Sequence, residues 1–305
     1  GISKPQIEIR DFLKSIIADD IFINSKKSPI YPLELDIYIP SKNFAIEYNG
    51  LAFHSFGKSK YTLLNNFETE EFHKYHMLQK HQQCAINNIV LFNIFENEWL
   101  DIIKQQIWKN IISNYLGATS NSIMARKCII NNVTVEEARQ FLDTNHLQGF
   151  RQSSVYLGLY YNDTLVQMMT FGKSRFNKKY EWEIIRLATS IGNHVIGGAS
   201  KLFNAFIKQY KPSSIIAYAD KRFSSGNVYK KLGFIEYKET KPNYFYFKEN
   251  TMKLFPRETF QKHKLHKLLD VFDPSLTEHE NMYNNGWRCI YDCGNKVFIW
   301  NKVIK

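Results

Sequence analysis

The sequence predicts a mixed α/β protein with more than one domain. Apolar runs that alternate like strands, at 33–39 and 44–48, occur close to a longer helical pattern at 67–85. With 305 residues, 44% of them hydrophobic, the chain can form two packed cores. A stretch of small and polar residues at 117–122 marks a boundary. We therefore expect three regions, at 1–118, 119–250 and 251–305.

Charge narrows the classes of partner. Lys and Arg number 40 against 29 Asp and Glu, which gives a net charge of +11 and favours a polyanionic partner, nucleic acid by default. The sequence has neither an apolar run of transmembrane length nor an apolar signal core, so we expect a cytoplasmic protein. Four scattered cysteines do not make a disulfide framework.

Two acids lie on what otherwise read as buried strands, in ELDIYIPSKNFAIEYNG at 34–50. A turn centred between Ser41 and Lys42 would pair the strands so that Asp36 stands opposite Glu47. Carboxylates that face each other at roughly 5 Å repel, and a hard divalent cation, Mg²⁺ or Mn²⁺, would neutralise them. A solvated strand face, with its acids paired to lysines, is the structural alternative.

A histidine follows the second strand, in Phe53-His54-Ser55. Its ordinary pKa of roughly 6.5 lets a histidine accept or donate a proton near neutral pH. Most single histidines are structural. Its position seven residues after Glu47 favours a catalytic role for His54.

These residues resemble the PD-(D/E)XK nucleases, in particular the branch of very-short-patch repair endonucleases and phage homing endonucleases with an EDxHD pattern. The resemblance covers about residues 3 to 100 and implies a restriction-endonuclease-like α/β core. It implies that Asp36 and Glu47 bind the metal and that His54 is catalytic. Three further candidates come with it: Asn49 in the slot where the superfamily carries lysine, Glu8 (or Gln6) as an acid on the first helix, and Lys80 as a displaced positive charge.

The second region alternates strands and helices. A helix is expected after Thr134, a hairpin at 154–171, strands at 180–188 and 214–219, a helix after the glycines at 197–198, and another at 226–232. This order resembles the GNAT acyltransferase fold over about 125–248, including the phage Mom type. In that resemblance, residues 194–199 occupy the place of the loop that cradles the coenzyme A pyrophosphate, and Tyr229 that of a tyrosine acid.

Three readings of this region stay open: an acyltransferase, a fold reused to hold DNA, or a spacer. We favour DNA binding because basic and aromatic residues gather there, and the basic tail extends the same expectation. A solvated charged face is the structural alternative. The predicted DNA-binding residues are Lys173, Arg175, Lys178, Lys179, Lys221, Arg222, Arg257, Lys262 and Lys264.

The sequence therefore predicts a metal-dependent, site-specific DNA endonuclease of phage or mobile-element type. Its fold would be a nuclease core, a GNAT-like domain and a basic C-terminal extension, with Mg²⁺ or Mn²⁺ as cofactor and duplex DNA as substrate. The main alternative is a DNA- or nucleotide-modifying GNAT-type acyltransferase with an attached nuclease-like domain, which would bind coenzyme A. A DNA-binding protein with an inactive nuclease core is a third reading. The sequence leaves open whether the protein is a monomer or a homodimer.

Overall fold

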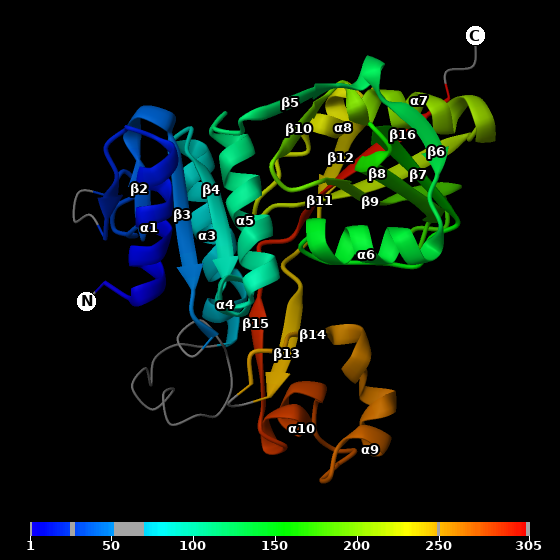
Figure 1. Cartoon of the computed structure of the whole chain (residues 1–305). Helices are drawn as coiled ribbons and strands as arrows, with labels where there is room; N and C mark the ends of the chain where they lie inside the picture. The colour runs from blue at the N-terminus through cyan, green and yellow to red at the C-terminus, as the bar shows by residue number, and fades with distance from the viewer. Residues whose placement is uncertain (1, 25–27, 52–69, 249–250, 303–305) are drawn as a thin grey trace. The chain divides into compact units, whose positions relative to one another are not determined.

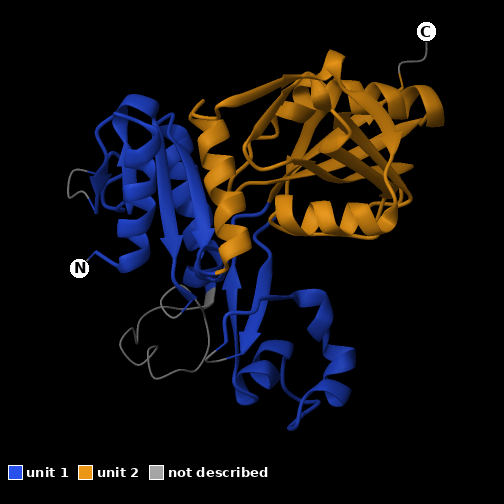
Figure 2. Ribbon diagram, in the orientation of Figure 1, with its two compact units in different colours: residues 1–100, 241–294 blue, residues 101–240, 295–305 orange. Residues whose placement is uncertain are grey.

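The computed structural model describes residues 2–24, 28–51, 70–248 and 251–302. They form a mixed α/β protein with two compact units (Figure 2). Unit 1 contains residues 1–100 and 241–294, and unit 2 contains residues 101–240 and 295–305. This division differs from the predicted boundaries at 118 and 250, because the tail is shared between the units and because the helical stretch at 96–115 is divided into two helices. Asp101 interrupts it, accepting hydrogen bonds from the backbone amides of Ile103 and Lys104 as the cap of the second helix.

The first part of unit 1 is a four-stranded sheet in the order β1-β2-β3-β4 with helices around it (Figure 1). β1, β2 and β3 are antiparallel, whereas β3 and β4 run parallel because α3 connects them. Its elements are α1 (Lys4–Ile16), β1 (Phe22–Ile23), β2 (Ile37–Ile39), β3 (Phe44–Asn49), α3 (Glu70–Ile86), β4 (Val90–Phe95) and α4 (Glu96–Leu100).

The hairpin of β2 and β3 has the predicted register. Ile37 pairs with Ile46 and Ile39 with Phe44, as a turn centred between Ser41 and Lys42 requires. A 3-10 turn at Pro40–Lys42 followed by Asn43, in the left-handed region at φ 46°, reverses the chain. β2 begins at Ile37, later than the expected 33, so Asp36 lies immediately before the strand.

The second part of unit 1 is a small sheet in the order β14-β13-β15, with short helices. The apolar side chains of Phe247, Ile290 and Cys293 pack in one core cluster with Met77 and Phe95 of the first part. The basic stretch after Pro256 forms two 3-10 turns followed by the four-residue α9. The elements are β13 (Tyr244–Lys248), β14 (Phe255–Pro256), α9 (Leu265–Leu268), α10 (Glu278–Asn284) and β15 (Trp287–Tyr291).

Unit 2 is built on a seven-stranded sheet in the order β12-β16-β11-β9-β8-β7-β6, and β5 and β10 form a separate parallel pair. Helix α6 begins after Thr134, whose side chain accepts a hydrogen bond from the amide of Glu137, as predicted. The elements are α5 (Ile102–Tyr115), β5 (Asn121–Met124), β6 (Ile129–Asn132), α6 (Val135–Asn145), β7 (Val155–Tyr161), β8 (Thr164–Lys173), β9 (Trp182–Thr189), β10 (Asn193–Ile196), α7 (Gly198–Tyr210), β11 (Ser214–Asp220), α8 (Asn227–Lys231), β12 (Ile235–Glu239) and β16 (Asn295–Asn301).

Two pairings in unit 2 position its polar groups. β16 lies between β11 and β12, whereas β15 pairs with β13 in unit 1, so β15 and β16 do not form a hairpin with each other. β9 and β11 are parallel but pair only at their first residues, Trp182 with Ile215 and Glu183 with Ile216. Beyond Glu183 the two strands diverge.

Across the described ranges, no helix is long and apolar enough to cross a membrane.

Candidate functional site

Asp36 and Glu47 meet at the start of the β2–β3 hairpin. The backbone amide of Asp36 donates to Oε1 of Glu47 at 2.9 Å, and the amide of Tyr48 donates to Oδ2 of Asp36 at 2.8 Å. Each carboxylate therefore binds the backbone next to the other. The side chain of Glu47 is 3% exposed, whereas Asp36 is half-buried. The antiparallel register thus holds two acids together at a place where water is largely excluded.

Burial and mutual repulsion make ionisation of this pair costly. Burial raises the pKa of Glu47 most, and the charge of Asp36 raises it further. Burial likewise raises the pKa of Asp36, against the lowering effect of the amide of Tyr48 and the charge of Lys80. A pair that resists ionisation when empty gains most from a cation that neutralises both groups.

Helix α3 places a lysine against the pair. Nζ of Lys80 lies 2.5 Å from Oε2 of Glu47, and its side chain is only 12% exposed. His76 lies one turn before Lys80 on α3. Burial lowers the pKa of His76 to about 4, and the charges of Lys80 and His73 contribute to this lowering. At neutral pH His76 is therefore uncharged and half-buried beside Lys80. The spacing of four residues between His76 and Lys80 in the sequence could have identified His76 as a neighbour of Lys80 on one helix face.

On helix α1, the structure brings Gln6 to the pair. Gln6 is 8% exposed and lowers the pKa of Asp36 through a side-chain hydrogen bond. Glu8 instead accepts a hydrogen bond from Nε1 of Trp99 at 3.1 Å and lies 3.8 Å from Nζ of Lys4. Of the two helix candidates, the structure therefore places Gln6, and not Glu8, beside Asp36. The capping box of α1 fixes which side chain faces inward, because Gln6 is the residue that bonds back to Ser3.

Asn49 and His54 are the two remaining nuclease candidates. Asn49 is 4% exposed, and its amide nitrogen donates to Oδ1 of Asn93 at 3.3 Å, so it bridges β3 and β4. This contact gives Asn49 a structural role between strands. His54 lies outside the described residues.

The donor set fits a hard divalent cation. Mg²⁺ takes oxygen ligands and commonly one or two protein carboxylates beside phosphate and water. Asp36 and Glu47 supply such a pair, and Lys80 adds a cation beside Glu47. Within the described ranges, no group of three or more His, Cys, Asp and Glu side chains suited to a metal occurs, so residues of these types supply only the two carboxylates here.

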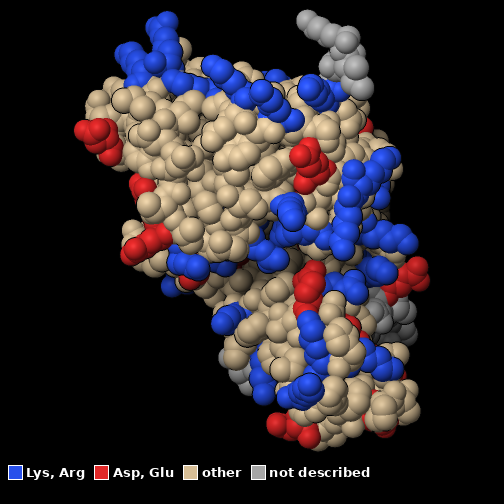
Figure 3. All heavy atoms as spheres, turned by 90° about the vertical axis from the view of Figure 1, so that its right-hand side faces the viewer, with Lys and Arg blue, Asp and Glu red and all other residues tan. Residues whose placement is uncertain are grey.

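Of the nine predicted DNA-binding residues, two are buried, six are exposed, and Arg175 is intermediate and bonded to Glu183. Lys221 and Arg222 are 2% and 3% exposed; Lys221 lies 2.6 Å from Glu239, and Arg222 lies 3.2 Å from Asp220. Both side chains are therefore buried and paired within unit 2 and are not exposed to a DNA backbone. Lys and Arg side chains are spread over the face drawn in Figure 3, with few acids among them. Of the predicted residues, those that are exposed are Lys173, Lys178, Lys179, Arg257, Lys262 and Lys264.

In unit 2, a strand pairing and a side chain take up part of residues 194–199, the stretch expected to cradle a pyrophosphate. β10 pairs in parallel with β5, His194 beside Ser122 and Ile196 beside Met124, so part of the expected pyrophosphate loop is in a strand ladder. Gly197 caps α7 at φ 77°. A Cβ on Gly198 would collide with the side-chain amide of Gln167. These contacts reduce the free backbone available for a pyrophosphate.

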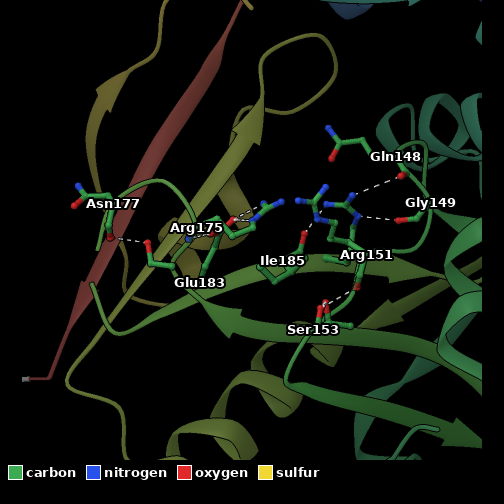
Figure 4. A network of polar contacts seen from close by, with 11 residues as sticks. Gln148, Gly149, Arg151, Ser153, Arg175, Asn177, Glu183 and Ile185 are labelled. Carbon is green, nitrogen blue, oxygen red and sulfur yellow. Dashed lines mark hydrogen bonds and ion pairs between the residues drawn. The ribbon is translucent and has the colours of Figure 1, made fainter. Parts of the chain in front are cut away.

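A second polar cluster lies where β9 and β11 diverge (Figure 4). Arg175 donates to the carboxylate of Glu183 from Nε at 3.1 Å, from Nη2 at 2.5 Å and from its backbone amide at 3.0 Å. Arg186 lies three residues after Glu183 on β9 and is 8% exposed. Tyr229 of α8 lies near the charges of Arg186 and Glu183, and burial raises its pKa to about 12.

Comparisons with known proteins give a structural likeness only. No family model matches the chain, and no curated protein matches its sequence. Among solved structures, a Bacillus subtilis acetyltransferase in complex with CoA is 16% identical with a TM-score of 0.33, covering 58% of this chain and 100% of its own. An IAA acetyltransferase from Bacillus cereus is 14% identical (TM-score 0.34; 57% and 99% covered), and an aminoglycoside 6'-acetyltransferase type Ii 11% identical (0.33; 58% and 99%). None of these three is a nuclease. Their TM-scores lie below 0.5, so we base neither candidate function on them.

Proposed function

We propose that this protein is a metal-dependent DNA endonuclease with Asp36 and Glu47 at its centre. One observation carries the proposal: two interlocked carboxylates, one of them almost fully buried, with Lys80 2.5 Å from Glu47. A structural ion pair would need one acid for one lysine. The second acid adds a repulsion that burial strengthens, and a divalent cation would relieve it.

Asp36 and Glu47 would hold Mg²⁺, which when bound lowers the pKa of a water molecule and polarises a phosphate. The amide of Tyr48 fixes the carboxylate of Asp36, and the amide of Asp36 fixes that of Glu47. Lys80 favours the ionised form of Glu47 and presents its remaining N–H groups to a phosphate oxygen. His54 would transfer the proton in the role that the sequence resemblance implies.

Duplex DNA is the proposed substrate because the chain carries a net charge of +11. The test is cleavage of supercoiled plasmid and of phage genomic DNA by the purified protein with Mg²⁺ and with EDTA. We expect Mg²⁺-dependent nicking or cutting that Asp36→Asn abolishes, and an exposed acid changed in the same way, Asp270→Asn, as the control with unchanged activity. Cleavage that persists in Asp36→Asn would refute the assignment.

A GNAT-type acyltransferase in unit 2 is the second candidate. It is favoured by α7 starting directly at Gly197-Gly198 after a strand, and by the buried Tyr229 beside Arg186 and Glu183. The β5–β10 pairing and the side chain of Gln167 count against it. Calorimetry of the full chain with acetyl-CoA tests it directly. Tight binding, together with acyl transfer lost in Tyr229→Phe, would favour this function; no heat of binding would reject it.

A further inference from the structure

The charges at the diverging strands of unit 2 do not balance. Arg186 is 8% exposed, and the three hydrogen bonds from its guanidinium all go to neutral carbonyl oxygens, those of Gly149 (2.8 Å), Ile185 (2.9 Å) and Gln148 (3.5 Å). A guanidinium has five N–H groups, so two are left without an acceptor among the residues that the structure describes. A buried cation that faces only neutral acceptors is costly unless an anion joins it.

Neighbouring charges increase the excess. Besides burial, the charges of Arg175 and Arg151 lower the pKa of Arg186 to about 10, and Glu183 is the one carboxylate that acts on it in the opposite direction. Glu183 is fully buried and already bonded three times by Arg175. Among the described residues, the cluster thus holds three guanidinium charges against one carboxylate.

The other titratable groups around Arg186 do not supply the missing charge. Burial, and then Arg186 itself, lowers the pKa of His146 to about 3, so this ring is neutral at pH 7. Burial raises the pKa of Tyr229 to about 12, so its hydroxyl is neutral as well. Both groups border the cluster without adding a negative charge.

The cluster can be reached from solvent through two of its members. Arg151 is exposed, and its guanidinium has no hydrogen-bond or ion-pair partner in the part of the chain that the structure describes. The side chain of Arg175 is 28% exposed, and its guanidinium lies 5.1 Å from the ring centre of Phe176. Phe176 is itself 66% exposed, so its ring is accessible from solvent. Figure 4 shows Arg151 and Arg175 extending from opposite sides of the network.

We propose that Arg151, Arg175 and Arg186 form a binding site for the phosphate group of a nucleotide, with Phe176 as a platform for its base. Guanidinium groups bind phosphate oxygens in pairs of parallel hydrogen bonds, and such bonds strengthen where water is excluded. An exposed aromatic ring beside a cationic site is the arrangement on which bases of single-stranded nucleic acid stack. The site lies in unit 2 and does not depend on the carboxylate pair of unit 1.

The phosphate could belong to a free nucleotide or to a DNA strand, and the experiment separates these sources. The full-length Glu47→Gln protein, in EDTA, is titrated with dAMP, with deoxyadenosine, and with a short single-stranded oligonucleotide. We expect the phosphate-bearing probes to bind and deoxyadenosine not to bind. Arg151→Gln should weaken binding about tenfold, the size of one lost charge-assisted hydrogen bond. Lys208→Gln, which removes an exposed cation from α7, is the matched control with unchanged affinity.

Each outcome decides a point. Binding of both dAMP and the oligonucleotide, weakened by Arg151→Gln and by Phe176→Ala, supports a nucleotide site. Binding of the oligonucleotide alone, weakened in the same way, supports the site and assigns the phosphate to DNA. Equal affinities in the Arg151→Gln, Lys208→Gln and parent proteins would overturn the proposal, as would deoxyadenosine binding as tightly as dAMP. Because Arg151 is exposed, its substitution should leave the protein folded, which circular dichroism would verify.

Discussion

Changing Glu47 to Gln should remove most of the pH dependence that the carboxylate pair gives to stability. Burial and the charge of Asp36 raise the pKa of Glu47 from 4.5 to about 7. A carboxyl group with a higher pKa in the folded than in the unfolded protein binds its proton more tightly when folded. Its stabilising contribution is therefore complete below pH 4.5 and is lost as pH rises through about 7.

The size of the effect follows from the same shift. One pKa unit corresponds to about 1.4 kcal/mol, so a rise from 4.5 to about 7 corresponds to about 3 kcal/mol once Glu47 is fully ionised. The glutamine cannot ionise, and its oxygen can still accept from the amide of Asp36. Relative to the parent protein, Glu47→Gln should therefore gain about 2.5 kcal/mol of stability between about pH 5 and about pH 8, because part of the effect is already present at pH 5.

Urea unfolding without metal, followed by tryptophan fluorescence at both pH values, measures this difference. Asp270→Asn, an exposed acid of unit 1, should show the pH dependence of the parent protein. Mg²⁺ should stabilise the parent protein most at about pH 8 and leave Glu47→Gln unaffected, because only a deprotonated pair binds the metal. A stability difference that is equal at both pH values would refute the reasoning.

Three further predictions concern activity. Gln6→Ala should slow Mg²⁺-dependent cleavage, whereas Glu8→Gln should leave it unchanged, as plasmid nicking rates would show; the reverse order would restore the original choice of helix acid. His54→Ala should slow cleavage on the order of 10²-fold without weakening Mn²⁺ binding, and a loss of both would indicate a folding defect instead. Changing Lys178 and Lys179 to Gln should flatten the salt dependence of duplex affinity measured by fluorescence anisotropy, and an unchanged slope would remove them from the DNA surface.

Features set by neighbours in the sequence could be predicted well. The β2–β3 register followed from alternation and a compact turn, and it brought Asp36 opposite Glu47. The start of α6 followed from Thr134, because a cap acts on amides within its own first turn. The pairing of Asp36 with Glu47 could be predicted from the sequence because both acids lie on one hairpin.

Features set by distant parts of the chain could not be predicted. Lys221 and Arg222 looked exposed in sequence, but Glu239 and Asp220 pair with them inside unit 2. β16 is inserted between β11 and β12, which no local pattern announces, and this insertion divides the tail between the two units. The excess charge around Arg186 was equally hidden, because it depends on residues of different strands and loops meeting where β9 and β11 diverge.

Metal binding at the carboxylate pair is the most direct test of the central claim. Mn²⁺ titrated into the full-length protein at about pH 8 and followed by electron paramagnetic resonance should reveal a bound population that disappears in both Asp36→Asn and Glu47→Gln. Asp270→Asn should bind as the parent protein does. Mn²⁺ binding that is unchanged in either variant of the pair, or absent from the parent protein, would contradict the assignment of Asp36 and Glu47 as a metal centre.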